Sequence, residues 1–169
     1  MDWSFNFTHS TEWSARPSLQ LGPPSLGTPW CYLLVERDGK PWLRVCLELE
    51  QADYPAFEEC LEWQSALWVG FGNRVFRIGL AELDTREYRL DSYFGSFYPL
   101  DHSLLICSAC RLYHLDALGN VLWTSPEIGL DGVLVSEVSQ FVIEGQGEWD
   151  PPGGWLNFRV DLNSGHLLT

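Results

Sequence analysis

Short apolar runs alternate with turn residues along most of this chain. Residues 30–35 and 42–49 are two such runs, rich in aromatic and branched side chains, and Arg37-Asp38-Gly39-Lys40 separates them. Asp-Gly between two strand-like runs is a strong local signal for a hairpin turn. We therefore expect an antiparallel hairpin over residues 30–49.

Three further pairs of strand-like runs follow at a regular spacing. Their first runs start at Leu67, Leu104 and Phe141, which are 37 residues apart. Their second runs carry matching aromatic residues, at Phe76, Tyr113 and Phe158. The third aromatic lies eight residues later than the spacing of the first two pairs requires, which indicates an insertion in the third hairpin loop. We expect three units with a 37-residue period over residues 60–169.

Short strands in units of about 40 residues are typical of β-propeller blades. In this arrangement residues 60–169 resemble quinoprotein-like and WD-type blades, although the Gly-His and Trp-Asp dipeptides of the WD repeat are not at their usual places. A closed propeller needs about four blades or more. The length of 169 residues indicates a single domain. We expect this domain to be all-β, either an open or partly wound set of antiparallel sheets or a compact four-unit barrel closed by the N-terminal hairpin.

Two segments depart from this pattern. Residues 1–28 mix Ser, Thr and Pro with isolated aromatics, and we expect an arm that packs on the body and includes a short strand at 3–8. Residues 52–63 place Pro55 early, acidic residues next, and Phe57, Cys60 and Leu61 at helical spacing. This pattern predicts one short helix near 55–63.

The composition supports strands and indicates the sign of a partner's charge. Aromatic residues make up 14% of the chain, and large flat side chains favour pleated, half-buried surfaces. The formal net charge is −13. A field of this sign repels nucleic acid and anionic membranes and attracts basic proteins, although solubility alone also explains it.

The remaining bulk features indicate a cytoplasmic location. The first residues carry no basic segment followed by an apolar run, and no run approaches the ~20 apolar residues of a membrane span. The five cysteines are odd in number and lie mostly in apolar runs, which favours reduced, buried thiols.

No residue pattern in the sequence indicates a catalytic centre. Cys107 and Cys110 form a C-x-x-C motif, but a second such motif and a His pair are missing, so we expect neither a metal site nor a cofactor. The four histidines are dispersed, and no nucleophile motif, phosphate loop or dinucleotide fingerprint is found.

The strongest candidate for a binding site is the inserted loop at residues 146–155. Two tryptophans flank Pro151-Pro152-Gly153-Gly154, and three acidic residues accompany them, so the candidate site residues are Glu144, Glu148, Trp149, Asp150 and Trp155. Tryptophan is enriched at binding hot spots, and a loop stiffened by proline loses little entropy on binding. Alternatively, both tryptophans fold back and plug the end of the sheet.

Three functions remain open. A small, acidic, all-β cytoplasmic protein resembles, at the level of class, the bacterial immunity proteins that neutralise toxin domains, which implies a non-catalytic protein that binds a basic partner. The second is a small-ligand or carbohydrate-binding module that uses Trp149 and Trp155. The third is an enzyme whose site is assembled from scattered residues.

Overall fold

The computed structural model describes residues 2–10, 18–24, 29–50 and 56–168. Within these ranges the chain forms strands and no helix, and the strands make four sheets with mostly antiparallel pairing. The expected all-β class is therefore confirmed.

The sheets follow one another along the chain. The first has the order β1-β3-β4-β2, with β1 Trp3–Thr8, β2 Ser18–Leu21, β3 Cys31–Arg37 and β4 Lys40–Leu47. The second has the order β5-β6-β7-β8, with β5 Glu58–Trp63, β6 Ala66–Phe71, β7 Arg74–Gly79 and β8 Thr85–Arg89. The third has the order β12-β11-β10-β9, with β9 Phe94–Pro99, β10 Ser103–Ser108, β11 Leu112–Asp116 and β12 Val121–Thr124. The fourth has the order β13-β14-β15, with β13 Val133–Val138, β14 Val142–Glu148 and β15 Trp155–Asp161.

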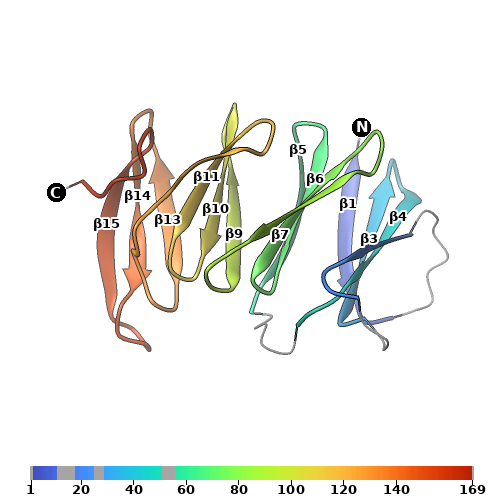
Figure 1. The fold of residues 1–169 in the computed structure, drawn as a ribbon, viewed down its shortest axis with the longest axis horizontal. Coiled ribbons are helices and arrows are strands. Elements are labelled where there is room, and N and C mark those ends of the chain that lie inside the picture. Colours follow the sequence, from blue (N-terminus) through green and yellow to red (C-terminus); the bar gives the residue numbers. More distant parts are fainter. Residues whose placement is uncertain (1, 11–17, 25–28, 51–55, 169) are drawn as a thin grey trace.

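The four sheets stand side by side in an open row, with the first and the fourth at opposite ends (Figure 1). A separate hydrophobic cluster fills each space between neighbouring sheets. Leu33 and Val69 belong to the first cluster, Trp68 and Phe97 to the second, and Leu105 and Phe158 to the third. Of the two arrangements expected from the sequence, the chain adopts the open one.

The N-terminal hairpin forms as predicted. Strands β3 and β4 pair antiparallel from Arg37–Lys40 outward, and Asp38 and Gly39 both take positive φ, as a tight hairpin turn requires. The expected strand at residues 3–8 is also present as β1. Within the predicted arm, Ser18–Leu21 form a strand that the sequence did not predict, β2, which pairs in parallel with β4.

The predicted helix near 55–63 is wrong over its described residues. Residues 58–63 form strand β5, which pairs with β6 through a tight turn at Gln64 and Ser65, both with positive φ. Residues 52–55, the start of the segment whose pattern led to that prediction, lie outside the described residues. The spacing of Phe57, Cys60 and Leu61 suited a helix, but pairing with the buried strand β6 decided the conformation.

The strands of the third hairpin extend further than the sequence indicated. The predicted loop began at Gln146, but β14 continues to Glu148. Gly145 and Gly147 both lie within β14. They are glycines because a Cβ at these positions would meet the Phe158 ring and the Ile128 backbone, respectively. Glycine in this strand therefore marks close approach and not a turn.

The three predicted first runs lie at central strands. Leu67 and Leu104 are in β6 and β10, and Phe141 directly precedes β14. The 37-residue period and the number of blades stay predictions.

Candidate functional site

A groove of about 540 Å³ crosses the ends of the second, third and fourth sheets, and we call it the end groove. Its walls carry four aromatic and two acidic side chains, which are Phe57, Tyr93, Tyr98, Trp155, Asp131 and Glu148. Most of the other lining residues are small or aliphatic, and none of the described lining residues is Lys or Arg. The volume lies within the range of ordinary ligand pockets, about 300–1,000 Å³.

The groove forms because the first strands of three neighbouring sheets start along the same side of the row. Phe57, Tyr93 and Gly132 each directly precede the first strand of their sheet, namely β5, β9 and β13. These residues are far apart in sequence, but the parallel placement of the three sheets brings their strand starts together (Figure 1).

Contacts across the groove hold its rims together. The Tyr93 hydroxyl donates to the Asp131 carbonyl oxygen at 2.5 Å and lies 3.0 Å from its carboxylate Oδ1. The rings of Phe57 and Tyr93 lie 6.1 Å apart between centroids. Phe57 remains 55% exposed, so one wall of the groove offers an open aromatic face.

Glu148 and Trp155 occupy the other wall as directly paired residues of β14 and β15. The Gly153 backbone N–H donates to Glu148 Oε1 at 2.6 Å, which fixes the carboxylate beside the hairpin turn. The indole of Trp155 packs so closely on Gly132 that a Cβ there would lie 2.9 Å from a ring carbon. The groove therefore presents a carboxylate and an indole in fixed neighbouring positions.

The structure separates the two tryptophans that the sequence placed in one patch. Trp155 lines the end groove, whereas Trp149 lines a different hollow with Ile128, Leu156 and Leu168. Trp149 directly follows the end of β14, and its side chain lies in this second hollow rather than in the end groove. The two indoles are 38% and 36% exposed, so neither is a buried core plug.

The remaining predicted residues lie outside the end groove. Asp150 is exposed at the turn, where its carbonyl oxygen accepts a hydrogen bond from Gly154 N–H. Glu144 lies in the middle of the fourth sheet and accepts a hydrogen bond from Arg159 Nε at 3.0 Å. Of the five predicted residues, the end groove contains Glu148 and Trp155.

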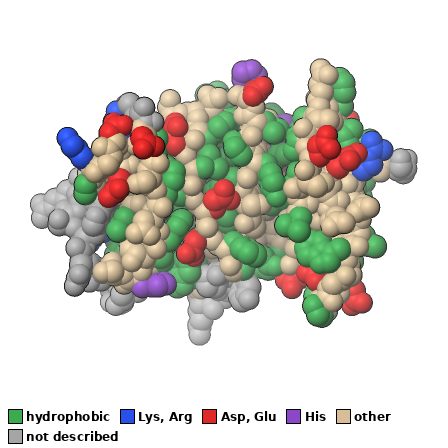
Figure 2. Space-filling view, turned by 180° about the vertical axis from the view of Figure 1, so that it is seen from behind, with side chains coloured by type: hydrophobic (Ala, Val, Ile, Leu, Met, Phe, Trp, Pro, Cys, Tyr) green, Lys and Arg blue, Asp and Glu red, His purple; other side chains and the backbone are tan. Residues whose placement is uncertain are grey.

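Acidic groups are spread widely over the surface around these hollows. Figure 2 shows Asp and Glu interspersed with hydrophobic side chains over one face, whereas Lys and Arg lie toward the two sides. The charge of −13 is thus not gathered in one patch on this face.

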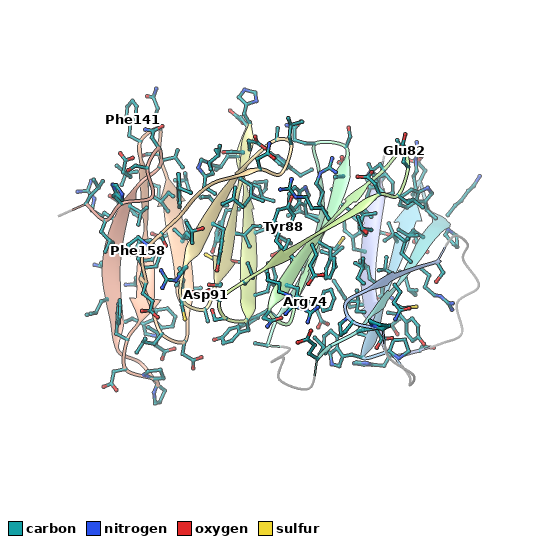
Figure 3. The ribbon with its side chains drawn as sticks, in the orientation of Figure 1. Arg74, Glu82, Tyr88, Asp91, Phe141 and Phe158 are labelled. Atoms are coloured by element: carbon teal, nitrogen blue, oxygen red, sulfur yellow. The ribbon has the colours of Figure 1, made fainter. Side chains whose placement is uncertain are left out.

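Asp91 is the centre of a polar network beside the groove. Its carboxylate accepts hydrogen bonds from Ser108 Oγ and the Tyr113 hydroxyl, both at 2.9 Å, and from Arg111 Nε at 2.6 Å. Burial raises the pKa of Asp91, but these donors outweigh burial and lower the pKa below its ordinary value. Asp91 and Arg74 lie toward the same end of the sheets, opposite Glu82 (Figure 3). Both carboxylate oxygens of Asp91 already have donors. The network therefore joins β10 and β11 to the turn before β9, which carries Asp91.

The five cysteines are buried or half-buried. All five are free thiols, and burial raises the pKa of both Cys107 and Cys110, which favours the protonated form. In the described part of the chain, no three His, Cys, Asp or Glu side chains are grouped so as to hold a metal ion.

Sequence reasoning missed Phe57, Tyr93, Tyr98 and Asp131. A signal for some of them was present, since an aromatic residue directly precedes the first strand of both the second and the third sheet. That the strand starts share one end could be inferred only from the stacking of the sheets.

No protein-family model matches this chain, and no curated protein matches it either. No helix within the described ranges is long and apolar enough to cross a membrane.

Proposed function

We propose that this chain is a non-catalytic binding protein whose end groove takes a basic segment of a protein partner. The observation that carries the proposal is the pairing of Glu148 with Trp155 in a groove that has aromatic walls and no Lys or Arg among its described lining residues.

A guanidinium or ammonium group suits this arrangement. A cation over an aromatic face gains about 0.5–2 kcal/mol, with more when water is excluded. A carboxylate held by the backbone adds a charge-assisted hydrogen bond, and Arg supplies the planar fork that binds a carboxylate with two donors. Glu148 is held in this way by Gly153, and Asp131, which the Tyr93 hydroxyl contacts, supplies a second carboxyl group to the groove.

The charge of the whole chain acts at longer range. A net charge of −13 raises the encounter rate with a cationic partner, and the effect decays over a Debye length of about 8–10 Å at ordinary salt. Acidity and a prearranged groove together support an immunity or inhibitor protein that neutralises a basic domain.

Calorimetric titration with an Arg-Gly repeat peptide tests the proposal. The double variant Asp131→Asn/Glu148→Gln is expected to weaken binding about tenfold or more, equivalent to about 1.4 kcal/mol. Trp155→Ala is expected to weaken it by a similar factor, because it removes the aromatic face.

The matched control is Glu82→Gln/Glu137→Gln, which removes the same two charges at exposed positions outside the groove. It should change the affinity less than twofold. Equal weakening by both double variants would show that net charge alone attracts the peptide, and the groove proposal would then be wrong.

A further inference from the structure

The fourth sheet has an outer face that no other sheet covers, and this face is hollowed. A concavity of about 680 Å³ lies over β13, β14 and β15, lined mainly by Leu134, Ser136, Glu144, Gln146, Asn157 and Arg159. We call it the sheet hollow. Leu134 is the one residue that it shares with the end groove.

Directly opposed side chains build the hollow as two cross-strand rows. Gln146 pairs with Asn157, and Gln146 Nε2 donates to Asn157 Oδ1 at 2.9 Å. Glu144 pairs with Arg159, and Arg159 Nε donates to Glu144 Oε1 at 3.0 Å. The side chains are therefore tied to one another across the strands rather than extended singly into water.

Each row keeps hydrogen-bonding capacity after these bonds are made. An amide pair joined by one bond retains the Nδ2 donors of Asn157 and the Oε1 acceptor of Gln146. The Glu144–Arg159 pair likewise retains one carboxylate oxygen and the terminal guanidinium donors. Donors and acceptors thus lie side by side on a concave surface, with Leu134 adding an apolar part.

The hollow is also neutral, in a chain of strongly negative charge. One carboxylate and one guanidinium, joined to each other, are its charged groups. A cationic ligand would be repelled by the guanidinium of Arg159, and an anionic ligand would be repelled by the carboxylate of Glu144. A neutral ligand rich in hydroxyl groups would meet neither repulsion. A hydroxyl both donates and accepts, so vicinal hydroxyls match neighbouring amide and carboxylate groups.

We infer that the sheet hollow is a binding site for a neutral saccharide. The sugar hydroxyls bond to the Gln146–Asn157 and Glu144–Arg159 rows, and a C–H face of the ring packs on Leu134. The site is distinct from the end groove, and its ligand does not depend on a basic partner.

Saturation-transfer NMR with maltotriose, cellotriose, chitotriose and mannotriose tests the inference. At least one trisaccharide is expected to receive saturation from the unmodified chain. Gln146→Ala/Asn157→Ala should reduce the affinity for that trisaccharide at least tenfold. Gln140→Ala/Asn163→Ala removes two exposed amides from turns of the same sheet and should leave the affinity within twofold.

Circular dichroism of both double variants establishes that they remain folded. If none of the four trisaccharides binds, the hollow is a hydrated polar surface without a saccharide site, and the inference is wrong. Equal affinity in Gln146→Ala/Asn157→Ala would also overturn it, because the sugar would then bind elsewhere.

Discussion

His114 is the buried titratable residue with the clearest consequence for stability. It lies on β11, 7% exposed, with its ring 4.9 Å from the Trp123 ring between centroids. Neither ring nitrogen has a hydrogen-bond partner among the described residues. Burial lowers the pKa of His114 below its ordinary value of 6.5, because the charged imidazolium is poorly solvated there.

This pKa shift predicts a loss of stability in mild acid. Below the ordinary pKa of 6.5 the unfolded chain binds a proton that the folded chain does not, so the free energy of unfolding falls as the pH drops from 6.5 toward the lowered pKa. Above that range His114 contributes no pH dependence. His114→Leu should therefore flatten the decline of melting temperature with falling pH.

Thermal unfolding at several pH values measures the effect. His102→Leu, at an exposed loop position, is the control and should keep the decline of the unmodified chain. A His114→Leu curve that still falls as steeply would mean that groups other than His114 govern the acid response. Glu59 is not one of them, because burial raises its pKa and its protonation therefore favours the folded chain in acid.

At the scale of elements, the sequence pattern predicted most strands and failed where contacts from elsewhere decided. Asp38-Gly39 predicted its hairpin because the turn conformation is a local property. The helix near 55–63 failed because pairing with β6 is not local. Gly147 was placed in the predicted loop, since the packing of the Ile128 backbone against it cannot be seen in the sequence.

The same limit applies to the candidate site. Glu148 and Trp155 could be predicted because they flank one inserted loop, and the hairpin pairs them directly. Phe57 and Tyr93 belong to other sheets, so their place in the groove follows from how the sheets stack. The sequence placed Trp149 beside Trp155, whereas the structure places the two indoles in different hollows, because where β14 ends could not be seen in the sequence.

Gly147 gives a direct test of the close packing in β14. The Ile128 backbone occupies the space where a Cβ would lie, so Gly147→Ala should force the 128–129 segment away from the strand. Such overpacking costs about 1–3 kcal/mol in the free energy of unfolding, measurable by urea denaturation. Gly95→Ala is the matched control in β9, where the nearest atom lies 3.4 Å from the Cβ position. Equal stability of the two variants would contradict the packing described for β14.

On the scale of the whole molecule, the open row explains where the two proposed binding surfaces lie. Three clusters bury the facing sides of the sheets, so the strand ends and the outer faces remain for binding. The end groove uses the strand starts of three sheets, and the sheet hollow uses the uncovered face of the fourth. The two surfaces therefore differ in the groups that line them. The end groove carries aromatic and acidic side chains, whereas the sheet hollow carries the two hydrogen-bonded cross-strand rows.

The central claim is that the end groove takes a cationic segment of a partner. Its most direct test is NMR of the ¹⁵N-labelled chain titrated with the Arg-Gly repeat peptide, following the indole N–H signals. We predict that the Trp155 indole and the Gly132 and Gly153 amides shift together with one dissociation constant, while the Trp149 indole stays in place. Shifts confined to Trp149, or spread evenly over the acidic surface without Trp155, would contradict the account.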